Sequence, residues 1–255
     1  NTEPQRHTEI ETDMKQIELK DVPTVRILML GDRGVGKTSL TNLMATTEIT
    51  PTPDSRTVGE ESWHVQVRLH EYSKPVILPP TPTWTTPSSS EDSENYPYMR
   101  STPTTTNILY FVEFYDLNSD WRMCRQQRES FYKNIDGIVL VYNMLELSSQ
   151  DSLHDWLYDP LRQICKHRHL RIRSILKNHN APILVVGTNL DKLMRRPLRR
   201  RGSIAHQLNV EEMLVNCLDP QSFVDKSRNQ GKLYGFLNRV IEFKEQFPLL
   251  SFRHL

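Results

Sequence analysis

The first hydrophobic run of the chain extends from Thr24 to Leu30, is rich in aliphatic side chains, and ends at a glycine. Such a run predicts a buried strand near the centre of a sheet. Residues 37–46, after the glycine-rich turn, are predicted to form a helix. Residues 63–69 alternate between apolar and polar side chains, which is the period of a half-buried strand. A further strand is predicted from Ile108 to Tyr115, directly before Asp116.

The second half of the chain alternates apolar strands with helical segments. Strands separated by helices pair in parallel through right-handed crossovers. The two strands within residues 61–115 form a hairpin and add one antiparallel edge strand. We therefore expect one α/β domain with three layers around a mostly parallel six-stranded sheet. The other predicted strands are residues 137–142, 182–187 and 213–217, and the other predicted helices are residues 121–134, 149–166 and 232–246.

Three segments are expected to lie outside this core. Residues 1–22 are polar and are predicted to form a mobile arm, and residues 248–255 form a tail without a cysteine for prenylation. Residues 73–107 are crowded with Pro, Ser and Thr, so we expect a disordered insertion in a domain that spans residues 23–247. The insertion is either a tolerated hairpin extension, because doubling a loop costs only about 0.6 kcal/mol, or a recruitment or phosphorylation segment.

Composition narrows the functional classes. The formal net charge is +1, so there is no global field that would attract nucleic acid. No apolar run reaches the roughly 18 residues of a membrane span, and the first residues contain no apolar signal region. The cysteines Cys124, Cys165 and Cys217 are odd in number and scattered, which fits a reducing compartment. We therefore expect a cytoplasmic protein.

The glycine-rich turn after the first strand carries the most specific chemistry. It reads Gly31-Asp32-Arg33-Gly34-Val35-Gly36-Lys37-Thr38, which is the pattern of a phosphate-binding P-loop. The glycines let successive backbone N–H groups point at a phosphate, and the following helix adds the positive end of its dipole. Lys37 is predicted to reach the β- and γ-phosphates, and the Thr38 hydroxyl to ligate Mg²⁺. The predicted phosphate-binding residues are Gly34, Val35, Gly36, Lys37, Thr38 and Ser39.

A P-loop alone does not select the base, and the choice depends on Asp191. This residue follows the strand that ends in Val185-Val186-Gly187-Thr188-Asn189. A carboxylate there can accept hydrogen bonds from both N1–H and the amino group of guanine, a donor pair that adenine lacks. Alternatively, Asp191 only caps the next segment.

With these motifs the chain resembles the Ras superfamily and, within it, the Rab branch. Thr57 in Thr57-Val58-Gly59 resembles the first-switch threonine that reaches Mg²⁺, and Asp116 stands where the second-switch motif begins. Asp191 stands at the end of the guanine motif, and Asn216-Cys217 resembles the last base-binding loop. The chain is most similar to the Rab-like protein 3 subfamily, which also lacks a prenylation cysteine. The resemblance implies a P-loop small-GTPase fold that binds GTP or GDP with Mg²⁺ ligated by Thr38, Thr57 and Asp116.

Several positions depart from the family pattern. Ser119 and Asp120 stand where a Ras-type switch has glycine and a glutamine that orients the attacking water. Because an ionised Asp120 cannot donate a hydrogen bond and is repelled by the γ-phosphate, we expect slow or absent hydrolysis. Arg33 either supplies positive charge to the transition state or points outward and obstructs an activating protein, and we favour the outward orientation. Asn189 replaces a lysine and is expected to bind the base less well.

Two basic stretches lie late in the chain, at residues 166–173 and 195–201. Such runs are most often solvated loops, and the alternative is an anionic partner such as a lipid surface or an acidic protein. Aromatic residues do not interleave with the charges, which argues against nucleic acid. Without a lipid anchor, any membrane contact is expected to be weak and transient.

The sequence therefore predicts a Rab-like GTP/GDP-binding regulatory protein in small-GTPase signalling or intracellular trafficking. The resemblance implies regulatory or effector partners, which include other small GTPases or their chaperones, and a homodimer. One rival is a GTPase that turns over with Arg33 or a residue from a partner. The other is a P-loop ATPase or nucleotide kinase.

Overall fold

The computed structural model describes residues 22–45, 63–75, 105–117, 132, 135–164, 181–194 and 202–246. The strands are β1 (Thr24–Leu30), β2 (Trp63–Pro75), β3 (Thr105–Leu117), β4 (Gly137–Asn143), β5 (Ile183–Thr188) and β6 (Glu212–Leu214). The helices are α1 (Lys37–Ala45), α3 (Leu147–Asp151), α4 (Leu153–Ile164), α6 (Ile204–Leu208) and α7 (Arg228–Gln246). Two short 3-10 turns are η3 (Leu190–Lys192) and η4 (Pro220–Phe223).

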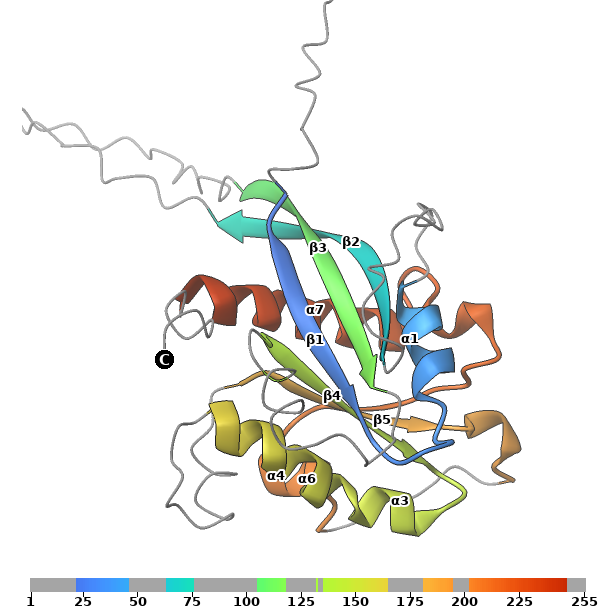
Figure 1. Cartoon of the computed structure of the whole chain (residues 1–255). Helices are drawn as coiled ribbons and strands as arrows, with labels where there is room; N and C mark the ends of the chain where they lie inside the picture. The colour runs from blue at the N-terminus through green and yellow to red at the C-terminus, as the bar shows by residue number, and fades with distance from the viewer. Residues whose placement is uncertain are drawn as a thin grey trace, which may run out of the picture.

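The six strands form one sheet in the order β2-β3-β1-β4-β5-β6. β1 pairs in parallel with β3 on one side and β4 on the other, and Figure 1 shows these three strands at the centre of the molecule. β2 alone is antiparallel, paired with β3 along its whole length at the edge of the sheet. The prediction of a mostly parallel sheet with one antiparallel edge strand is confirmed.

Alternate side chains of β1 enter two separate hydrophobic layers. Ile27 and Met29 pack in the layer that contains the buried side chains of α1 and α7. Leu28 and Leu30 pack in the layer that contains those of α4 and α6. All four side chains are fully buried, which explains why the strand is apolar at successive positions. The three-layer architecture places the carboxyl ends of five parallel strands at one edge.

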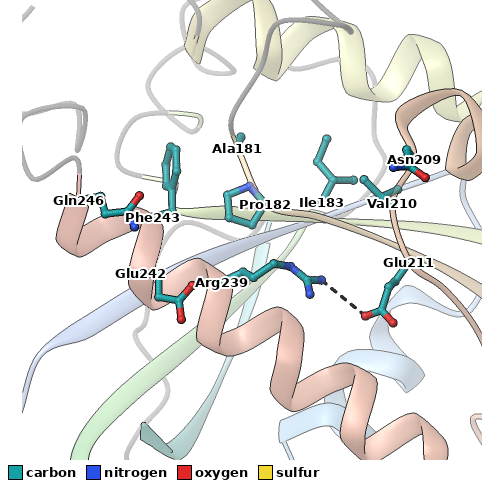
Figure 2. Close-up of a pocket in the computed structure, with 10 residues that line it drawn as sticks. All are labelled: Ala181, Pro182, Ile183, Asn209, Val210, Glu211, Arg239, Glu242, Phe243 and Gln246. Atoms are coloured by element: carbon teal, nitrogen blue, oxygen red, sulfur yellow. Dashed lines mark ion pairs between the residues drawn. The ribbon is translucent and has the colours of Figure 1, made fainter. Parts of the chain in front are cut away.

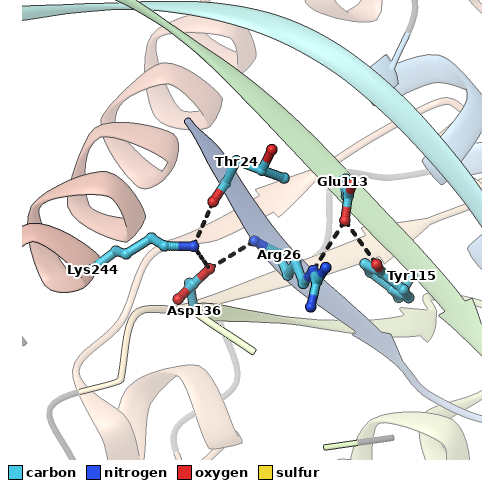
Figure 3. A network of polar contacts seen from close by, with 6 residues as sticks. All are labelled: Thr24, Arg26, Glu113, Tyr115, Asp136 and Lys244. Atoms are coloured by element: carbon cyan, nitrogen blue, oxygen red, sulfur yellow. Dashed lines mark hydrogen bonds and ion pairs between the residues drawn. The ribbon is translucent and has the colours of Figure 1, made fainter. Parts of the chain in front are cut away.

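The amino-terminal end of β1 is tied to α7 by a buried carboxylate (Figure 3). Asp136 is 3% exposed and accepts hydrogen bonds from Lys244 Nζ at 3.1 Å and from the Arg26 amide at 2.9 Å. Lys244 also donates to the Thr24 carbonyl, and the Arg26 side chain reaches Glu113 of β3 at 3.1 Å. Burial raises the pKa of Asp136, and the charge of Lys244 opposes this rise. The last turns of α7 are thereby fixed at the end of the sheet opposite the P-loop.

β2 also packs against α7, and polar contacts add to the apolar packing of this strand. The Arg68 guanidinium lies 5.0 Å from the ring centre of Tyr234, and His70 Nε2 lies 2.7 Å from Asn238 Oδ1. Both residues of β2 are buried. Burial lowers the pKa of His70, so the folded protein favours its neutral imidazole. These contacts hold the edge strand against the helix.

The hairpin is longer than the sequence indicated, which corrects the boundaries of the insertion. Residues 73–75 of β2 pair with residues 105–107 of β3, although we expected the disordered insertion to span 73–107. Side chains explain the extension: Ser73 Oγ lies 2.8 Å from Asn107 Oδ1, and Lys74 Nζ lies 2.7 Å from Glu245 of α7. The rest of the insertion lies outside the described residues, as do most of the N-terminal arm and all of the tail.

Other boundaries also differ from the prediction. The helix expected over 149–166 is divided into α3 and α4, and Ser152 between them is the C-terminal cap of α3. β6 is only three residues long, and α7 begins at Arg228, four residues before the predicted start. The helix predicted over 121–134 lies almost wholly outside the described residues. Across the described part of the chain, no helix is long and apolar enough to cross a membrane.

Candidate functional site

The phosphate loop joins the end of β1 to the start of α1, as the motif requires. Gly31 has φ +147°, and a side chain there would place its Cβ only 2.1 Å from the carbonyl oxygen of Val141 on β4. Gly36 has φ +92°, a conformation that suits glycine. Val35 is buried beneath the loop, and the Leu40 amide donates to the Gly36 carbonyl at the first turn of α1. The loop therefore needs its glycines for close approach and for positive φ.

Lys37 spans the inside of this loop. Its ammonium group donates to the carbonyl of Gly31 at 2.9 Å and to the carbonyl of Asp32 at 2.7 Å, and the residue is 7% exposed. Burial lowers the pKa of Lys37, while the charges of Asp116 and Asp32 act in the opposite direction. The lysine is thus held across the loop, where a point charge can meet phosphate oxygens.

Thr38 and Asp116 meet beside the loop, although 77 residues separate them in the sequence. The Thr38 hydroxyl donates to Asp116 Oδ2, and Asp116 is 4% exposed. Asp116 Oδ1 is buried and has no hydrogen-bond partner among the described residues. Burial raises the pKa of Asp116, and the Thr38 hydrogen bond and the charge of Lys37 oppose the rise. An orphaned carboxylate oxygen beside a hydroxyl fits Mg²⁺, which prefers oxygen ligands.

Thr188, at the end of β5, connects the base side of the site to the phosphate loop. Its hydroxyl lies 2.6 Å from the Val35 carbonyl and 3.1 Å from the Tyr142 carbonyl, and the residue is fully buried. The Thr188 hydroxyl thereby connects the end of β5 to the phosphate loop and to the end of β4. The next residue, Asn189, has φ +58°, a left-handed conformation that asparagine adopts more readily than most residues. Its amide donates to Asn143 Oδ1 at 2.8 Å.

Asp191 and Cys217 come from different loops but lie near each other. Asp191 is exposed within η3, and Cys217 follows β6. The pKa of the Cys217 thiol is raised to about 11, first by burial and then by the charge of Asp191. Asn216 shapes the same loop, because its side-chain oxygen accepts from the Leu218 amide at 2.9 Å. The residues predicted to hold the base are therefore brought together at the carboxyl edge of the sheet.

Of the predicted switch and catalytic residues that remain, only Arg33 is among those that the structure describes. Its side chain is exposed on the loop. Thr57, Ser119 and Asp120 lie outside the described residues, so their predicted roles remain predictions. In the described part of the chain, no three His, Cys, Asp or Glu side chains lie together as a group of metal ligands. A metal here would instead need the threonine hydroxyl and the Asp116 carboxylate together.

Sequence patterns assign no role to Asp32, but its carboxylate accepts two side-chain hydrogen bonds in the structure. Its carboxylate accepts from the Ser152 hydroxyl and from the Trp156 indole N–H, both at 2.7 Å. His64 is a second residue without a sequence signal, and it lies directly opposite Asp116 in the hairpin. No local pattern in the sequence indicates either contact.

A hollow of about 550 Å³ lies at the opposite edge of the sheet, between α7 and the chain around β5 and β6 (Figure 2). Pro182, Ile183 and Phe243 form part of its wall. Its charged side chains include Arg239 and Glu211, which pair with each other at 3.6 Å. None of the predicted nucleotide-binding residues lines this hollow, so it is separate from the P-loop.

The sheet order and the loops at its carboxyl edge define an α/β P-loop domain of the small-GTPase type. No protein-family model matches the chain. Rab-like protein 3 of Bos taurus is 27% identical over 231 residues, which cover 86% of this chain and 84% of that protein. The Xenopus tropicalis protein of the same name is 28% identical over 86% of this chain and 85% of its own length. The Homo sapiens protein is 26% identical, with 86% and 84% covered. The chain resembles Rab-like small GTPases over most of its length, as its motifs indicated.

Proposed function

We propose that this protein binds GDP and GTP as a Rab-like regulatory protein and hydrolyses GTP slowly. The observation that carries the proposal is that two groups of residues meet at one edge of the sheet. The first is the P-loop with the hydrogen bond from the Thr38 hydroxyl to the buried Asp116 carboxylate, and the second is the pair of loops that carry Asp191 and Cys217. A bare glycine turn between a strand and a helix would require neither feature. The resemblance to Rab-like protein 3 supports the same assignment.

In this proposal, different residues bind the phosphates, the metal ion and the base of the nucleotide. Backbone N–H groups of the loop and the first turn of α1 bind the phosphates, and Lys37 adds positive charge. Thr38 and Asp116 would hold Mg²⁺, which would neutralise phosphate charge. Asp191 accepts hydrogen bonds from the guanine edge, and Thr188 keeps this loop in register with the phosphate loop. By its resemblance to the first-switch threonine, Thr57 would complete the metal site in the GTP state.

Slow hydrolysis follows from the residues after Asp116. Ser119 and Asp120 supply neither the glycine nor the glutamine that a Ras-type switch uses. Intrinsic Ras-type hydrolysis is about 10⁻⁴ to 10⁻³ per second even with that glutamine. We therefore propose signalling through partner proteins that recognise the bound nucleotide, in the cytoplasm or at a membrane surface. Single-turnover hydrolysis of bound GTP tests this part, and a rate at or above the Ras-type value would contradict it.

Base selection is tested by Asp191→Asn. The carboxamide replaces an acceptor with a donor, which matches the additional carbonyl of xanthine. The variant should lose affinity for GDP and gain affinity for xanthosine diphosphate, with ADP binding weak in both proteins. Asp219→Asn, in the loop after β6, is the matched control and should leave the preference unchanged. An unaltered preference in Asp191→Asn would remove this residue from the base site and favour a P-loop protein of another nucleotide class.

A further inference from the structure

Asp32 places a carboxylate on the phosphate loop itself, where negative charge is unfavourable for binding phosphates. The structure shows where this charge is directed. Ser152 donates to Asp32 Oδ2 and Trp156 Nε1 donates to Asp32 Oδ1, each at 2.7 Å. The carboxylate is thus fixed towards the junction of α3 and α4. Trp156 is 8% exposed, so this indole N–H is largely withdrawn from solvent.

The same residue also supports Lys37 through its backbone. The Asp32 carbonyl accepts from Lys37 Nζ at 2.7 Å, next to the bond that Lys37 makes with Gly31. Asp32 therefore links two contacts: its side chain binds Ser152 and Trp156, and its backbone carbonyl binds Lys37. Movement of α4 relative to the loop would shift both the charge of Asp32 and the carbonyl that holds Lys37.

Backbone hydrogen bonds order the junction between α3 and α4, which carries both donors. The Ser152 carbonyl accepts from the Asp155 amide at 3.0 Å and from the Trp156 amide at 3.2 Å, so it opens the first turn of α4. This local structure accounts for the helix break and presents both donors on one side. Leu153 and Leu157 anchor α4 in the hydrophobic layer beneath.

We propose that Ser152 and Trp156 are positioning residues that hold the Asp32 carboxylate away from the nucleotide phosphates and so set phosphate affinity from α4. This inference rests on the proposed function, because it concerns the same nucleotide site. A tie that only stabilised the fold would affect every ligand equally. If the two residues instead hold the Asp32 charge away from the phosphates, their loss should weaken affinity more as the ligand carries more negative charge.

The test compares guanosine, GMP, GDP and GTP as ligands of the full chain in the presence of Mg²⁺. Trp156→Phe removes the N–H and keeps an aromatic ring, and Ser152→Ala removes the hydroxyl. For each variant we expect GTP affinity to fall about tenfold, because the lost hydrogen bond is to a charged group. Guanosine affinity should be unchanged, and GMP and GDP should lie between. His154→Ala, at a half-buried position on the same helix, is the matched control and should bind all four ligands as the wild type does.

A second test asks whether removing the Asp32 charge restores the GTP affinity that Trp156→Phe loses. Asp32→Asn removes the charge, so adding it to Trp156→Phe should restore most of the lost GTP affinity. Unfolding temperatures without nucleotide show whether each variant is folded, and Ser152→Ala provides the milder substitution if the tryptophan variant is not. An equal loss for all four ligands, or a further loss on adding Asp32→Asn, would overturn the positioning role. If the wild type bound no guanine nucleotide, the proposed function would fail together with this inference. If the wild type bound and both variants matched it, only this inference would fail.

Discussion

Asp116→Asn should stabilise the metal-free protein and at the same time abolish its response to Mg²⁺ and GDP. The carboxylate is 4% exposed, yet the described residues give it one hydrogen bond, from the Thr38 hydroxyl, and leave Oδ1 without a partner. Burial raises its pKa, which means that the folded environment disfavours the charge. Asparagine has nearly the same shape and carries no charge, so the substitution isolates the electrostatic cost.

The magnitude follows from two opposing effects. A buried polar group without its hydrogen bonds costs about 1 to 3 kcal/mol, and more when it is charged. The substitution also removes the attraction between Asp116 and Lys37, which are both buried. This attraction acts on the pKa of Asp116 less strongly than burial does, so it offsets only part of the gain. The net expectation is a stabilisation of about 1 to 2 kcal/mol. For a chain of this size, 1 kcal/mol corresponds to about 2–4 °C in Tm.

Thermal denaturation measures both halves of this prediction. Without metal and nucleotide, Asp116→Asn should unfold a few degrees above the wild type. With Mg²⁺ and GDP in excess, the wild type should gain the larger stabilisation, because ligand binding to the folded state raises Tm by mass action. Asp136→Asn is the control, since Asp136 has a charged partner in Lys244 and its loss should lower Tm in both conditions. A metal-free Asp116→Asn protein that unfolds earlier, or one that keeps the full Mg²⁺ response, would refute the reasoning.

Two further substitutions test the packing of α7. The pKa of His70 is lowered by burial, so the unfolded chain takes up a proton as pH falls below about 6.5 while the folded chain resists it. Stability should therefore be lost as pH falls through this range and be unaffected above it, and urea denaturation of His70→Gln should show a smaller loss; an identical pH profile would contradict the assignment. Lys244→Met should cost about 2–3 kcal/mol, somewhat less than a fully buried pair, because Asp136 would keep only a backbone donor. Adding Asp136→Asn should recover part of that loss, and purely additive losses in denaturant midpoints would count against a direct pair.

The features that could be predicted from the sequence are those fixed by neighbouring residues. The strand before Gly31, the loop and the start of α1 follow one another directly, so local pattern was sufficient. Placing Asp116 beside Thr38 needed the family resemblance, because no residue near either one indicates their contact. The structure shows the hydrogen bond between them, and an Asp116 carboxylate oxygen that has no partner among the described residues.

The features that could not be predicted depend on distant parts of the chain. Asp32 is more than a hundred residues from Ser152 and Trp156, and a carboxylate on a loop has no local signal for such partners. The hairpin extends beyond its apolar segment because Lys74 finds Glu245 on α7. In both cases tertiary contacts, which composition and periodicity do not encode, determine the local structure.

The central claim is that the P-loop of this protein holds a guanine nucleotide. It is tested most directly by measuring which nucleotide accompanies the native protein through purification in Mg²⁺, with native mass spectrometry and chromatography of the released ligand. We predict GDP or GTP at close to one molecule per chain, and its loss in Lys37→Ala. An adenine nucleotide at that stoichiometry, or a folded chain that neither carries nor takes up guanine nucleotide, would contradict the account.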